Sequence, residues 1–177
     1  VSQEFGAGQA QKQPARPVWE DCAVYCRAKE FCETLEIERS YFNPKHDKCY
    51  CDRCYQGKEV IDTDGPDSYV VPKGWVRFGL KVAANYTSKD LNIFKKWSAS
   101  FHGVKSKLVL QSILQHQGLM MPGTKLLDGQ ELRSTKCAGR QDEGYYTSQT
   151  IKYAGLKFYA EPQKIDGTLD TLAASLV

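Results

Sequence analysis

The sequence lacks long apolar runs, and no stretch approaches the roughly 20 consecutive apolar residues that a helix needs to cross a bilayer. It also lacks a strong charge of either sign, because 24 basic and 21 acidic residues leave a formal net charge of +3. A nucleic-acid-binding domain would carry a marked excess of positive charge. We therefore expect neither a membrane nor a nucleic acid as a partner.

The N-terminal segment, residues 1–17, lacks the apolar region of a secretory signal peptide. It is polar and contains two prolines, which predicts a flexible arm. The chain does not begin with Met, as expected for a fragment or a processed chain. Its seven cysteines are an odd number, so a secreted disulfide framework would leave one of them free. These features favour an intracellular location.

The composition is that of a folded globular protein, with 41% hydrophobic and 11% aromatic residues. A chain of 177 residues is long enough for one domain with its own core and a smaller appendage. Short predicted strands mix with short predicted helices, without an internal repeat or a regular βαβ pattern. This mixture indicates the α+β class.

Six of the seven cysteines lie in the first third of the chain. Residues 19–37 predict a helix, on which Cys22 and Cys26 would face the same side because they are four positions apart. Further along, Cys51 and Cys54 form a C-x2-C pair. Thiolates at this spacing are typical of tetrahedral zinc sites, in which a second pair of ligands comes from elsewhere in the chain.

We therefore predict a structural zinc site whose ligands come from five cysteines, namely Cys22, Cys26, Cys49, Cys51 and Cys54. Cys32 and His46 are further candidates for the second pair of ligands. The alternatives are disulfide bonds, or thiols that are buried as small hydrophobic groups. Cys137 stands apart and has no visible base partner, so we do not expect it to be a catalytic nucleophile.

The middle of the chain predicts a strand, a tight turn and an amphipathic helix in succession. Apolar and polar residues alternate over residues 97–101, as they do in a strand with one buried face. From Val104 the apolar spacing becomes helical, and Gly118 is expected to end the helix in a left-handed conformation. At the turn, Gly103 lets a ligand approach the backbone and His102 offers a directional hydrogen bond.

Residues 144–155 combine a predicted strand end with a short predicted helix. We predict that a strand ends at Ser148, which then caps a short helix that stops at Gly155. Residues 156–160 predict another strand, and the tail from residue 168 has a weakly helical pattern.

Three segments stand out by their order and spacing. They are Phe42-Asn-Pro-Lys-His-Asp-Lys-Cys-Tyr-Cys-Asp-Arg-Cys54 with Gly74-Trp-Val-Arg-Phe78, Phe101-His-Gly103 with Gly118-Leu-Met-Met-Pro-Gly123, and Tyr145-Tyr-Thr-Ser-Gln-Thr-Ile-Lys-Tyr-Ala154. Together they resemble the C-terminal region of neuralized-like proteins, an ADP-ribosyltransferase-like domain of the PARP type. The resemblance covers residues 42–160.

This resemblance implies an α+β fold made of a small split antiparallel sheet and short helices, preceded by a small Cys-rich, zinc-binding segment. We accordingly divide the chain into four parts. They are a flexible arm (residues 1–17), the Cys-rich segment (18–62), the ADP-ribosyltransferase-like domain (63–163) and a tail (164–177).

The resemblance also assigns roles to individual residues. In such transferases a histidine bonds a ribose hydroxyl of NAD, and the glycine after it presents backbone groups to the nicotinamide carboxamide; His102 and Gly103 match these positions. Tyrosines of the second motif stack on the nicotinamide ring, and Tyr146 and Tyr153 match them. The resemblance thus implies NAD as the cofactor, four binding residues, and catalytic roles for His102 and Tyr146.

Two positions depart from the family pattern. The residue after the His-Gly pair is usually Ser or Thr, but here it is Val104, so one hydroxyl contact is missing. The family's third motif is a glutamate on a late strand. Glu161 is the only glutamate after residue 160, adjoins Pro162 and follows the second motif too closely. We therefore expect the third-motif glutamate to be missing.

Three hypotheses about function follow, and each has a protein as the partner. The first is an NAD-dependent mono-ADP-ribosyltransferase that modifies a protein acceptor. The second is a noncatalytic structural or interaction module of a larger assembly with the same fold. The third is a zinc-binding adaptor linked to ubiquitin ligation, as neuralized-like proteins are.

Overall fold

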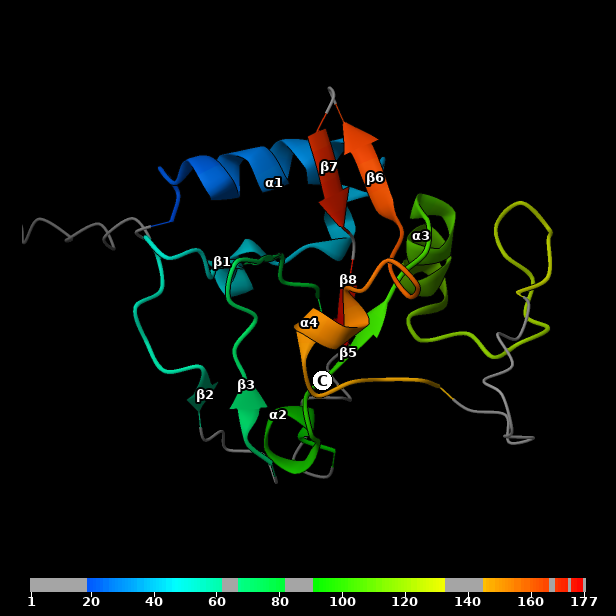
Figure 1. The fold of residues 1–177 in the computed structure, drawn as a ribbon. Helices are drawn as coiled ribbons and strands as arrows, with labels where there is room; N and C mark the ends of the chain where they lie inside the picture. Colours follow the sequence, from blue (N-terminus) through cyan, green and yellow to red (C-terminus); the bar gives the residue numbers. More distant parts are fainter. Residues whose placement is uncertain are drawn as a thin grey trace, which may run out of the picture.

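The computed structural model describes residues 19–61, 67–81, 91–132, 145–165, 168–171 and 173–176. Short helices combine with two-stranded antiparallel sheets, which confirms the predicted α+β class (Figure 1). None of the helices in these ranges combines the length and the apolar character that a membrane crossing needs. The predicted arm at residues 1–17 and Cys137 lie outside the described residues.

The first half of the described chain contains one long helix, two turns of 3-10 helix and four two-residue strands. They are α1 (Ala23–Thr34), η1 (Arg39–Tyr41), η2 (Pro44–His46), β1 (Lys48–Cys49), β2 (Val60–Ile61), β3 (Tyr69–Val70) and β4 (Val76–Arg77). The strand β1 pairs with β4 and β2 pairs with β3, both antiparallel. The domain boundary predicted after residue 62 therefore falls between two paired strands.

The helix α1 is shorter than the one predicted over residues 19–37. Cys22 is its N-cap and has an extended backbone, with φ −84° and ψ 123°. After Thr34 the chain turns through Glu36, whose φ of 53° lies in the left-handed region and stops the helix. Cys22 thus lies at the start of the helix and not on its side.

The second half contains three further helices and four strands. They are α2 (Ile93–Lys96), β5 (Ser100–Gly103), α3 (Lys107–His116), α4 (Ile151–Ala154), β6 (Pro162–Ile165), β7 (Thr168–Thr171) and β8 (Ala173–Leu176). The strand β6 pairs with β7, and β5 pairs with β8. In Figure 1, α1 lies along the top of the view, α3 at the right, and α4 near the centre next to β5.

The strand β5 is paired along both edges. On one edge His102 lies opposite Ala174 of β8. On the other edge Phe101 and Ser148 exchange two backbone hydrogen bonds, of 2.7 and 2.9 Å. This second pairing brings the segment around Tyr146 next to His102 and Gly103. The tight turn predicted at these two residues was wrong, because both continue β5 and pair with β8.

The helix α3 forms where the apolar spacing predicted it, but its end differs. Ser106 caps it, because its side chain accepts a hydrogen bond from the backbone N–H of Val109. Gln117, not Gly118, adopts the left-handed conformation, with a φ of 54°. The N–H groups at this end reach back to the carbonyls of the last turn, which closes the helix one residue earlier than predicted.

Three local predictions after residue 144 were wrong. Thr150, not Ser148, caps α4, because Ser148 is held by its backbone pairing with Phe101. Residues 156–160 form a hydrogen-bonded turn, since the N–H groups of Tyr159 and Ala160 both bond to the carbonyl of Leu156. The tail is extended, because β7 and β8 find partners in β6 and β5.

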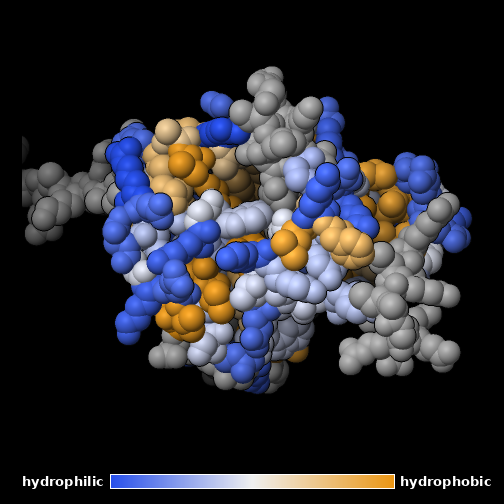
Figure 2. Space-filling model, viewed as in Figure 1, coloured by the Kyte–Doolittle hydropathy of each residue, from blue (hydrophilic) through white to orange (hydrophobic). Residues whose placement is uncertain are grey.

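Hydrophobic side chains gather in two clusters. The first lies at α1 and the β1–β4 pair and consists of Cys22, Tyr25 and Cys49 with Trp19, Cys51, Cys54, Val76 and Phe78 around them. The second lies at α3 and consists of Val104, Ile113 and Met120 with Val109, Leu110, Leu119, Leu126 and Leu132. Figure 2 shows apolar residues near α1, near α3 and over β2 and β3, separated by hydrophilic residues.

Two aromatic contacts join the first half of the described chain, residues 19–81, to the second half. The ring of Tyr69, on β3, lies 6.0 Å from the ring of the buried Phe101. Trp75 packs against Gly155, where a Cβ would lie only 2.8 Å from the indole Cζ2. The two halves of the described chain are therefore packed together, although both contacts lie after the boundary predicted at residue 62.

We expect Phe101→Ala to destabilise the fold strongly, because its side chain is only 1% exposed and packs against the ring of Tyr69. Truncation of a buried Phe costs about 3–5 kcal/mol. Phe158→Ala is the matched control, because that side chain is 62% exposed, and it should cost less than about 1 kcal/mol. Denaturant unfolding of both variants checks this, and equal losses would contradict it.

Candidate metal centre and predicted cofactor site

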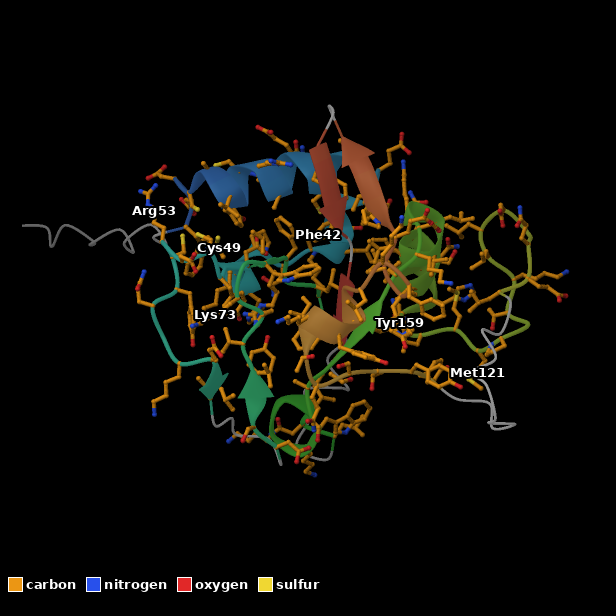
Figure 3. The ribbon with its side chains drawn as sticks, viewed as in Figure 1. Phe42, Cys49, Arg53, Lys73, Met121 and Tyr159 are labelled. Carbon is orange, nitrogen blue, oxygen red and sulfur yellow. The ribbon has the colours of Figure 1, made fainter. Side chains whose placement is uncertain are left out.

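Four cysteine thiols converge at one point in the structure. The sulfurs of Cys22, Cys49, Cys51 and Cys54 all lie within 4.8 Å of one another, so this group could hold a metal ion. The first comes from the start of α1, the second from β1, and the last two from the turn after β1. Figure 3 shows Cys49 beneath α1, where these elements meet.

The spacing of the sulfurs fits metal coordination and excludes a disulfide bond. Cys22 Sγ lies 3.9 Å from Cys49 Sγ and 3.6 Å from Cys51 Sγ. Neighbouring sulfurs in a tetrahedral zinc site lie about 3.8 Å apart, because the Zn–S bonds are about 2.3 Å long. A disulfide would bring two sulfurs to about 2.05 Å. The cysteines in the described ranges are all free thiols.

Local backbone structure places each of these thiols. The N–H of Cys22 bonds to the carbonyl of Trp19, which fixes the turn before α1. Cys49 is held by its pairing with Val76 on β4. The carbonyl of Cys51 accepts from the N–H groups of Cys54 and Tyr55, at 3.0 and 2.9 Å, and this tight turn brings the C-x2-C pair to one side.

The local environments of these thiols shift their pKa values in different directions. Backbone N–H groups at the start of α1, chiefly that of Tyr25, lower the pKa of Cys22 to about 6. Burial raises the pKa of Cys49, and burial with the nearby Cys22 raises the pKa of Cys54 to about 11. A divalent cation would hold all of them as thiolates and offset this cost of burying charge.

The structure leaves three predicted or candidate ligands outside this group. Cys26 is exposed and its thiol donates to the carbonyl of Glu20 at 3.4 Å. The expected alignment with Cys22 fails because Cys22 is an extended N-cap and not a helical residue. Cys32 is half-buried on α1, and burial raises its pKa to about 11. His46 is exposed and lies outside the thiol group, and its backbone carbonyl accepts a hydrogen bond from Arg77 Nε.

A buried carboxylate that the sequence analysis missed supports the metal group. Asp47 Oδ2 accepts from the hydroxyl of Tyr25 at 2.6 Å, and Asp47 Oδ1 accepts from the N–H of Gly79 at 2.8 Å. Burial, together with Asp47, raises the pKa of Tyr25 and keeps it a donor. These bonds tie α1 to the chain after β4. Nothing in the spacing of the sequence marks Asp47 for this role.

The predicted site residue His102, on β5, contacts the second motif through one hydrogen bond. His102 Nδ1 lies 2.8 Å from the carbonyl oxygen of Tyr146. A carbonyl only accepts, so Nδ1 carries the proton and Nε2 of the neutral ring is left as an acceptor. An acceptor at this position suits a hydroxyl group of a ligand.

Gly103 lies at the point where the pairing between β5 and the second motif stops. Alternate residues of a strand direct their backbone groups to the same edge, so those of Gly103 face the edge where Phe101 bonds Ser148. Within the described ranges no backbone hydrogen bond joins Gly103 to Tyr146. On its other side the residue is tightly packed, since a Cβ would lie 2.3 Å from the carbonyl oxygen of Ala154.

The two predicted stacking residues lie on the surface. The side chains of Tyr146 and Tyr153 are 42% and 52% exposed. Tyr153 lies against Tyr159, which the sequence analysis did not select, with the hydroxyls 2.9 Å apart and the ring centroids 5.2 Å apart. Tyr153 also lines an open surface depression of about 340 Å³ together with Thr150, Lys152 and Leu156. His102 and Tyr146 do not line this depression.

The strands after α4 carry no glutamate that could serve as the third motif. Glu161 is exposed and directly precedes β6, whose residues are Pro162–Ile165. The strands β7 and β8 contain no glutamate either.

No known protein-family model matches the chain, and no solved structure matches it at a significant level. The resemblance to neuralized-like and PARP-type proteins therefore stays a prediction.

We expect Gly103→Ala to destabilise the contact between β5 and α4, because the added Cβ would meet the backbone oxygen of Ala154 at 2.3 Å. Overpacking of this kind costs about 1–3 kcal/mol. Gly118→Ala is the matched control, since a Cβ there has no neighbour within 4 Å. Thermal unfolding compares the two, and an unchanged melting temperature for Gly103→Ala would show that α4 moves freely.

Proposed function

We propose that the chain binds one structural zinc ion through Cys22, Cys49, Cys51 and Cys54. The single observation that carries this proposal is the convergence of four thiols within 4.8 Å from three separate elements. Four soft thiolates in tetrahedral arrangement are the ligand set that zinc prefers in structural sites. All four positions are supplied by protein, so the ion has no open position for a substrate and its role is to hold the fold.

The need for such an ion follows from the small size of the elements around it. The strands β1 and β4 have two residues each, and so contribute few backbone hydrogen bonds. Small assemblies of this kind commonly depend on a metal, because they bury too little apolar surface to be stable alone. The ion would cross-link the start of α1 to the β1–β4 pair and to the C-x2-C turn.

We expect the purified chain to contain about one equivalent of zinc, and we expect Cys49→Ser to lose it. Apparent binding free energies of structural zinc are about 10–16 kcal/mol, so its loss should unfold the region around α1. Metal analysis and circular dichroism measure both effects. Cys26→Ser is the matched control, because Cys26 is exposed and outside the group. A metal-free wild-type chain would refute the site.

A second proposed function is binding of NAD in front of His102, with ADP-ribose transfer to a protein acceptor as the reaction class. The observation that favours it is the hydrogen bond from His102 to the Tyr146 carbonyl, which leaves Nε2 as an acceptor for a ribose hydroxyl. The backbone groups of Gly103 face the edge of β5 on which Phe101 bonds Ser148. The ring of Tyr153 packs against Tyr159 but is 52% exposed, which leaves part of it for stacking.

In such a transfer, the bond between nicotinamide and ribose breaks, and nicotinamide leaves with the bonding electrons. A nucleophile of the acceptor protein then bonds the ribose carbon and loses a proton. A glutamate would stabilise the positive charge that develops on the ribose, and the described strands after α4 contain none. We therefore propose that NAD binds and that transfer is slow. Such a domain would be compatible with a noncatalytic role in a larger assembly.

We expect NAD at ten times its Kd to raise the melting temperature by about 3–6 °C, because this concentration adds about 1.4 kcal/mol of stability. His102→Ala should abolish the shift. His116→Ala is the matched control, since His116 is an exposed residue at the end of α3. Incorporation of labelled ADP-ribose separates transfer from binding. A flat titration at millimolar NAD would leave the zinc-stabilised interaction module as the function.

A further inference from the structure

The β1–β4 pair has a second face, opposite the metal group, on which two positive charges stand side by side. Lys48 pairs with Arg77 in the antiparallel register, so their side chains project from the same face. Cys49 and Val76 form the next pair and project from the other face, towards α1. Like charges directly opposite each other destabilise a strand pair. An anion bound between the two side chains would remove this repulsion.

Both cations are held against the same aromatic ring. The ring of Tyr50, which is 3% exposed, lies 5.1 Å from Lys48 Nζ and 5.9 Å from the guanidinium carbon of Arg77. Lys48 Nζ also lies 5.4 Å from the ring of Tyr55. Cation–π contacts of this kind fix the positions of the charges without neutralising them.

The remaining hydrogen-bonding capacity of the two cations is available to a ligand. Arg77 uses Nε to donate to the carbonyl of His46 and also hydrogen-bonds the hydroxyl of Tyr69, which fixes the plane of its guanidinium and leaves its other N–H groups. Within the described parts of the chain, no carboxylate forms an ion pair with Lys48 or with Arg77. Arg77 is exposed and Lys48 is half-buried, so solvent and ligands can reach the pair.

We propose that Lys48 and Arg77 bind a phosphate monoester. Such a group carries close to two negative charges at pH 7 and presents three acceptor oxygens. Arg matches phosphate oxygens with its planar fork of donors, and Lys adds a compact charge at the side. A dianion neutralises both cations, whereas a single carboxylate would leave one of them uncompensated. The phosphate belongs either to a small molecule or to a phosphoserine side chain.

Metal and anion would act on the same short strand. Cys49 lies between Lys48 and Tyr50 in the chain, so the metal-facing residue fixes the backbone that carries Lys48 and the ring that both cations contact. The proposal itself depends on neither the identity of the metal nor NAD binding. A failed NAD titration therefore leaves it intact.

The test is a thermal-shift titration of the metal-loaded chain with inorganic phosphate, at constant ionic strength set with chloride. We expect saturating phosphate to raise the melting temperature by about 2–5 °C. Lys48→Gln and Arg77→Gln should each remove most of this shift, and Lys48→Arg, which keeps the charge, should retain it. The matched control is Lys29→Gln, an equal charge change on the exposed side of α1. Metal content is measured for every variant.

A phosphopeptide titration identifies the source of the phosphate. A phosphoserine peptide that shifts the melting temperature more than equimolar phosphate identifies a protein as the source, and equal shifts identify a free phosphate. No shift in the wild type, or an unchanged shift in Lys48→Gln at full metal content, overturns the proposal.

Discussion

The structure depends on the meeting of four thiols at the start of α1. The start of α1, the strand β1 and the C-x2-C turn converge there. The strands β1 and β4 in this region have only two residues each, so they share few backbone hydrogen bonds. The buried Asp47 adds a second tie between α1 and the chain after β4. A metal ion bound by these thiols would replace part of the apolar burial that a larger core provides.

The strand β5 is the second organising element of the fold. In the first half of the described chain, Tyr69 and Trp75 contact Phe101 and Gly155 of the second half. The strand β5 in turn holds β8 on one edge and the second motif on the other. The segment with the His-Gly pair is therefore positioned by non-local contacts on every side, and its chemistry depends on the packing of the whole described chain.

The sequence was informative where function depends on local spacing. The C-x2-C pair and Cys49 could be assigned to a metal because a single turn brings them together. Cys26 was chosen on the assumption that Cys22 is helical, and the extended N-cap removes that alignment. Asp47 could not be found, because its partners lie 22 and 32 positions away and carry no motif. The extended tail likewise depends on its distant partner β5.

The indole of Trp75 sits at the junction of the two halves, packed against Gly155 where no side chain would fit. An indole changes its emission when water reaches it. The protein therefore carries its own optical reporter of whether the chain around β4 stays packed against the end of α4. Trp19 lies beside the thiol cluster and Trp97 is 46% exposed, so replacing these two with Phe would isolate the signal from the junction.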